Sequence, residues 1–128
     1  MAGSFRELVV WQRAMQLALV VYRLTKEFPR EELYGLTGQM RRAAVSLPSN
    51  IAEGHGRLNR AEFRQFLGIA RGSNFELQTQ LQIAKELGMG NPASLCTAES
   101  LSQEVGKMLF ALLESIKRPA RKKLISDL

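Results

Sequence analysis

Apolar residues recur along this chain at intervals of three and four, the spacing of an amphipathic helix. No stretch alternates apolar and polar residues long enough between turn signals to predict a strand. The pattern predicts four helices, at residues 8–27, from near 31 to 53, 59–88, and from just after 92 to 119. Short connections between helices of similar length favour antiparallel neighbours, so we expect an all-α, up-down-up-down four-helix bundle.

Local chemistry marks the ends of these helices. Pro29 stops the first helix, and Asn59 with Glu62 forms a capping-box pattern at the start of the third. Pro48 lies inside the second helix, where the missing N–H predicts a kink or short break over residues 46–49. Residues 1–119 form the predicted domain, and residues 120–128 a frayed basic tail.

The first helix carries more apolar surface than one core contact requires. Two adjacent stripes cover about half of its circumference. Either the core is wide on this side, or part of the helix meets another subunit or a third neighbour.

Composition narrows the class of protein. A chain of 128 residues that is 45% hydrophobic is typical of one soluble domain. The formal charge of +6 and pI of about 10.0 favour polyanionic partners. Apolar runs such as residues 18–22 are too short to span a membrane, and the N-terminus lacks the order of a signal peptide, so we expect a cytoplasmic protein with no membrane contact.

Few residues suit catalysis. The lone His55 lies between two glycines, where we expect a solvated loop histidine, and the lone Cys96 is expected to pack in the core. One histidine excludes a ferritin-like di-iron site, and no Gly-rich phosphate loop is present. We therefore expect a protein that is not an enzyme and uses no cofactor or metal.

Arginines are the more informative residues. Six arginines and no lysine lie between positions 41 and 71, and their planar forks suit phosphate oxygens. Arg57, Arg60, Arg64 and Arg71 are spaced to line one side of the third helix. A second basic cluster lies at 117–123. The candidate nucleic-acid-binding residues are Arg41, Arg42, Arg57, Arg60, Arg64, Arg71, Arg121, Lys122 and Lys123. The alternative to nucleic-acid binding is that these arginines form a solvated surface, with some of them in salt bridges between subunits.

Several segments resemble a known family. They are FREL at 5–8 with VWQ at 10–12, YGLT at 34–37, QMRRAAVSLPSNIAEG at 39–54, and EF at 62–63 through ELQTQ at 76–80. These segments, covering roughly residues 5–88, resemble the four-helix-bundle proteins encoded in intervening sequences of bacterial large-subunit ribosomal RNA genes.

The resemblance implies a homopentamer around a central pore, a basic surface and RNA binding. A related fold occurs in the accessory variability determinant of diversity-generating retroelements, which partners a reverse transcriptase and its template RNA. We therefore expect a non-enzymatic oligomer that binds structured RNA, or DNA, and keep as the alternative an accessory or scaffold protein for a reverse transcriptase.

Polar residues at buried positions of the second and third helices have a structural explanation. We expect them to form a hydrogen-bonded network that fixes register or a subunit contact. The expected members are Gln39, Ser46, Asn50, Ser73 and Gln80, with Glu53 and Glu76 nearby. Asn74 lies on the same buried seam of the third helix.

Overall fold

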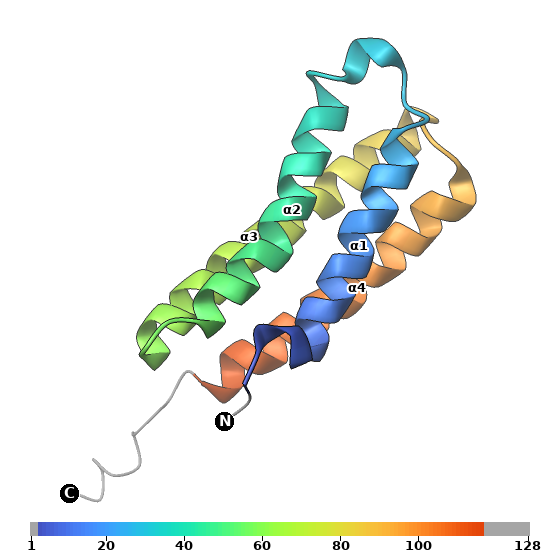
Figure 1. Cartoon of the computed structure of the whole chain (residues 1–128). Helices are drawn as coiled ribbons and strands as arrows, with labels where there is room; N and C mark the ends of the chain where they lie inside the picture. Colours follow the sequence, from blue (N-terminus) through green and yellow to red (C-terminus); the bar gives the residue numbers. More distant parts are fainter. Residues whose placement is uncertain (1–2, 117–128) are drawn as a thin grey trace, which may run out of the picture.

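The computed structural model describes residues 3–116, which form four α-helices and two short 3-10 helices and contain no strand. The helices are α1 (Val9–Thr25), α2 (Leu36–His55), α3 (Arg60–Glu86) and α4 (Pro92–Ser115), with η1 (Phe5–Glu7) before α1 and η2 (Arg30–Glu32) before α2. Each helix packs on its neighbours in sequence, and α4 returns against α1 (Figure 1). The predicted all-α antiparallel four-helix bundle is confirmed.

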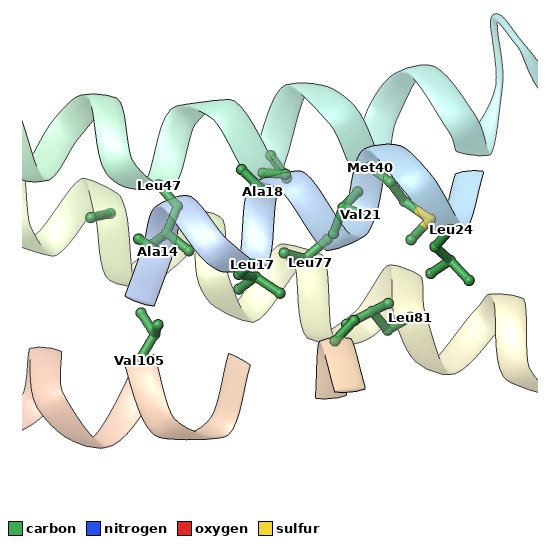
Figure 2. Close-up of a cluster of buried hydrophobic side chains, with 14 of the residues drawn as sticks. Ala14, Leu17, Ala18, Val21, Leu24, Met40, Leu47, Leu77, Leu81 and Val105 are labelled. Atoms are coloured by element: carbon green, nitrogen blue, oxygen red, sulfur yellow. The ribbon is translucent and has the colours of Figure 1, made fainter. Parts of the chain in front are cut away.

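The core runs along the bundle axis and draws on all four helices. Leu17, Met40, Leu77 and Val105 are fully buried, one from each helix, and their side chains converge between the ribbons (Figure 2). Ala70, Leu77 and Ala84, which are spaced seven residues apart on α3, are all fully buried in this core.

The connection between α1 and α2 is longer than predicted. The helix expected near Glu31 begins at Leu36, and α1 ends at Thr25 instead of Glu27. Phe28 is buried and anchors the connection. The Glu32 carboxylate accepts a hydrogen bond from the Leu36 N–H at 3.1 Å. Its negative charge therefore stabilises the positive N-terminal end of α2, although Glu32 lies four residues before the helix begins.

Of the kink or short break expected at Pro48, the break is absent, since α2 continues from Leu36 to His55. A proline inside a helix costs about 3 kcal/mol because one hydrogen bond is lost. Leu47, Pro48 and Ile51 are all buried, and this packing holds the helix together. The Asn50 side chain also donates to the Ser46 carbonyl at 2.8 Å.

The predicted Asn59 cap of α3 is confirmed, and Asn91 caps α4 in the same way. Asn59 Oδ1 accepts from the Glu62 N–H at 2.8 Å, and Asn91 Oδ1 accepts from the Ala93 N–H at 2.8 Å. At the end of α3, Gly88 has φ +69°, a conformation that favours glycine and closes the helix. The predicted tail at 120–128 lies outside the described residues.

The expected network forms only in part. Asn50 Nδ2 donates to Ser46 Oγ at 3.0 Å, but the buried Gln80 Oε1 has no hydrogen-bond partner among residues 3–116. Asn74 and Ser102 join α3 to α4, with Ser102 Oγ donating to Asn74 Oδ1 at 2.8 Å and Asn74 Nδ2 donating to the Ser102 carbonyl at 3.0 Å. The Ser46 and Ser73 hydroxyls join α2 to α3 at 2.8 Å. The depth predicted for Gln39 is wrong, because its position on α2 is exposed.

Within residues 3–116, the helices lack the combination of length and apolar character that a membrane span requires.

Candidate nucleic-acid interface

The turn between α2 and α3 collects arginines at one end of the bundle. This turn lies at the end opposite the α1–α2 and α3–α4 connections (Figure 1). Arg60 is the first residue of α3 and Arg64 lies one turn later, and both are exposed. Among residues 3–116, neither makes a side-chain hydrogen bond or ion pair. Their guanidinium groups are free to contact an anion.

Arg57 lies in the turn before α3, at the same end of the bundle, but its side chain is directed to a different side from those of Arg60 and Arg64. Its guanidinium pairs with Glu53 Oε2 at 2.9 Å and lies 4.7 Å from the centroid of the Phe66 ring. Phe66 packs toward α2, where a Cβ on Gly54 would meet Phe66 Cβ at 2.8 Å. The predicted stripe of four arginines is therefore corrected to Arg60, Arg64 and Arg71.

Arg71 lies farther along α3, in a groove between α3 and α4. Its guanidinium carbon is 5.1 Å from the ring centroid of Phe75 and 5.8 Å from that of Phe110. The groove has a volume of about 520 Å³, and Arg64 and Gly72 also line it. Arg64 connects this groove to the exposed end of the bundle.

The remaining candidates lie elsewhere. Arg41 packs against the end of α1, with its Nε donating to Thr25 Oγ1 at 2.9 Å and its guanidinium carbon 4.7 Å from the Tyr22 ring centroid. This arginine connects α2 to α1. Arg42 is exposed on the α2–α3 side, beside Ser46 and Glu76. Arg121, Lys122 and Lys123 lie outside the described residues.

Two predictions about titratable residues are wrong. His55 is the last residue of α2, half-buried, with its ring edge-on to Phe63 at 6.3 Å, and not in a solvated loop. Cys96 is exposed on α4 and does not pack in the core. In the part of the chain that the structure describes, no three His, Cys, Asp or Glu residues gather closely enough to hold a metal ion.

A second groove, between α1 and α2, is apolar. Its volume is about 540 Å³, and Trp11, Leu19, Tyr22 and Val45 line it. Leu19 is 50% exposed and Val45 is 46% exposed. Part of the wide apolar surface predicted on the first helix thus faces outward and is not used by the core.

Sequence reasoning missed the aromatic partners of Arg71. Phe75 and Phe110 come from different helices, so no local pattern pairs them. A signal for the groove was nevertheless present, because Gly68, Gly72 and Phe75 share one side of α3 and leave a shallow strip beside an exposed ring.

Comparisons with known proteins relate this chain to a family and to a solved structure. A family model described as 23S rRNA-intervening sequence protein matches residues 6–111. A solved structure from Bacteroides thetaiotaomicron, described as a protein with unknown function from the S23 ribosomal protein family, superposes with a TM-score of 0.76. It is 22% identical and covers 83% of this chain and 96% of its own, which shows a shared fold. No curated protein matches the chain.

Proposed function

We propose that this chain, which belongs to the 23S rRNA-intervening sequence protein family, is a non-enzymatic oligomer that binds structured RNA through the arginines at the α2–α3 end of the bundle. The observation that carries the proposal is the exposure of Arg60 and Arg64 without a carboxylate partner among the described residues. If these arginines serve only to keep the surface hydrated, their substitution leaves RNA binding unchanged. Substituting them therefore distinguishes a role in solubility from a role in RNA binding.

Placement at the helix start supports an anionic ligand. The N-terminus of a helix carries a partial positive charge, so cations there are unfavourable for stability and anions are favourable. Arg60 and Arg64 occupy the first two turns of α3, where their charge opposes this preference. A phosphate at this position would interact favourably with both guanidinium groups and the helix dipole.

Self-association is part of the proposal. The α1–α2 groove exposes Leu19 and Val45, and no charged residue lines it. Exposed apolar patches of this kind mark protein contacts. We infer that this groove contributes to the homopentamer that the resemblance implies, which would multiply the number of arginine ends available to one RNA.

The test compares two double variants that lose the same charge. R60A/R64A removes the free arginines. R23A/R30A removes two exposed arginines at the α1–α2 connection, one in the last turn of α1 and one in η2. Binding of a fluorescent structured RNA is measured at fixed salt. We expect the dissociation constant of R60A/R64A to rise about tenfold or more, since a hydrogen bond to a charged group contributes about 1.5–3 kcal/mol, and that of R23A/R30A to change much less.

Equal losses in the two variants would mean that only net charge matters, and the proposed interface would be wrong. If R60E/R64E keeps RNA binding but loses co-purification with a reverse transcriptase, the alternative role as an accessory protein is favoured instead.

A further inference from the structure

Two glycines line the α3–α4 groove, and no packing contact among residues 3–116 requires either of them. Gly68 and Gly72 lie one turn apart inside α3, where glycine destabilises a helix relative to alanine. A Cβ built on either residue would meet nothing within 4 Å. By contrast, packing requires a glycine at position 54, because a Cβ on Gly54 would collide with Phe66. In the part of the chain that the structure describes, the space beside Gly68 and Gly72 is therefore open to a ligand.

The groove also exposes two aromatic rings. Phe75 is 51% exposed and Phe110 is 52% exposed, although both are large apolar side chains. The guanidinium carbon of Arg71 lies 5.1 Å from the Phe75 ring centroid and 5.8 Å from that of Phe110. Cation–π contacts with these rings restrain Arg71, so the groove presents a charged planar group beside two exposed rings.

We propose that the α3–α4 groove binds an unpaired nucleobase of the RNA, with the base lying over Gly68 and Gly72 and stacking on the aromatic rings or on Arg71. This inference rests on the RNA-binding function proposed above. Bases of single strands, loops and bulges stack on aromatic side chains and on guanidinium planes, whereas the base faces of a duplex are covered. The volume of about 520 Å³ falls in the range of small-molecule sites.

Charge favours a nucleotide over an apolar protein segment. Arg64 and Arg71 line the groove together with one carboxylate, from Glu114. The α1–α2 groove has no charged residue in its lining and suits an apolar protein contact better. Arg64 lies between the aromatic rings and the exposed end of the bundle, in position to bind the phosphate attached to the stacked base.

The experiment measures binding of the full-length chain to a fluorescent single-stranded RNA and to a blunt duplex of the same sequence. F75L/F110L removes both rings but keeps apolar side chains at two half-exposed positions, so folding is preserved. We expect its dissociation constant for the single strand to rise about tenfold, since a base stacked on an aromatic ring contributes a factor of about 5–150, and its duplex affinity to stay unchanged.

Two further variants distinguish a base site from a general loss of apolar surface. I69A/I83A removes two half-exposed apolar side chains that do not line this groove, and its single-strand affinity should equal that of the parent chain. Gly72→Leu fills open space at the groove floor, so it should weaken single-strand binding while the thermal unfolding temperature is maintained.

The outcomes are distinct. If the parent chain binds RNA and F75L/F110L binds the single strand equally well, the base site is wrong and the proposed function stands. If the parent chain binds no RNA, both are wrong. If F75L/F110L changes the native mass of the assembly, the groove is a subunit contact and the base site is overturned.

Discussion

At the scale of single residues, the contact between Asn74 and Ser102 shows how a polar pair is accommodated in an apolar core. Both residues are buried, at 1% and 0% exposure. The Ser102 hydroxyl donates to Asn74 Oδ1, and Asn74 Nδ2 donates to the Ser102 backbone carbonyl, so the Asn74 amide is paired in the low-dielectric interior. The pair fixes which residues of the two helices face each other.

Ser102→Ala tests this role. The substitution removes the hydroxyl donor and leaves Asn74 Oδ1 buried without its partner, which costs about 1–3 kcal/mol. Urea unfolding should therefore show a loss of stability of that size. Thr97→Ala is the matched control on α4, since the Thr97 hydroxyl donates to the Ala93 carbonyl at an exposed position. Equal losses in the two variants would show that the buried pair contributes nothing specific.

The arginines show that a residue's role depends on its neighbours. Arg41 and Arg57 have partners within the bundle, respectively Thr25 with Tyr22 and Glu53 with Phe66. Arg60 and Arg64 have no such partners among residues 3–116. Of these four arginines, only Arg60 and Arg64 could bind RNA without breaking a contact within the bundle.

At the scale of elements, the close approach of α2 to α3 depends on Gly54. A Cβ at this position would lie 2.8 Å from Phe66 Cβ and 3.1 Å from Phe63 Cδ1. The helices would have to separate, because Phe66 Cβ is bonded to the α3 backbone and the Phe63 carbonyl oxygen lies only 3.3 Å from the added Cβ.

Gly54→Ala should consequently destabilise the protein by about 1–3 kcal/mol, the cost typical of overpacking. Gly72→Ala should stabilise it by up to about 1 kcal/mol, since alanine favours a helix and its methyl group meets open space. Thermal unfolding of the two variants measures both effects. Shifts in the same direction would contradict the described packing of α2 on α3.

Elements with local signals were predictable from the sequence. The caps at Asn59 and Asn91 act on the residues that follow them directly, so the starts of α3 and α4 could be predicted. The start of α2 could not, because it depends on the burial of Phe28 and on a carboxylate four residues upstream. Periodicity located Arg60, Arg64 and Arg71 on one side of α3, but the ring of Phe110 comes from another helix.

At the scale of the whole molecule, the apolar and basic surfaces are separate. The apolar groove lies between α1 and α2, whereas Arg60 and Arg64 lie at the start of α3 and Arg71 lies between α3 and α4. This separation lets one surface associate with further copies while the other contacts RNA.

Leu19→Glu should dissociate the proposed assembly. The substitution places a charge in a groove that has none, and desolvating that charge in a subunit contact is unfavourable. Native mass spectrometry should show smaller species than the parent chain forms. Leu33→Glu is the control, because Leu33 is 47% exposed and lies outside this groove. Unchanged masses for Leu19→Glu would place the subunit contact elsewhere.

The salt dependence of RNA binding tests the central claim most directly. A plot of log affinity against log salt concentration has a slope that grows by about 0.7 per phosphate contact on a single strand and about 0.9 on a duplex. We predict a shallower slope for R60A/R64A than for the parent chain, by about 1.4 to 1.8, the sum of two such contacts. A parent slope near zero, or an unchanged slope in the variant, would contradict an interface in which these two arginines bind the RNA backbone.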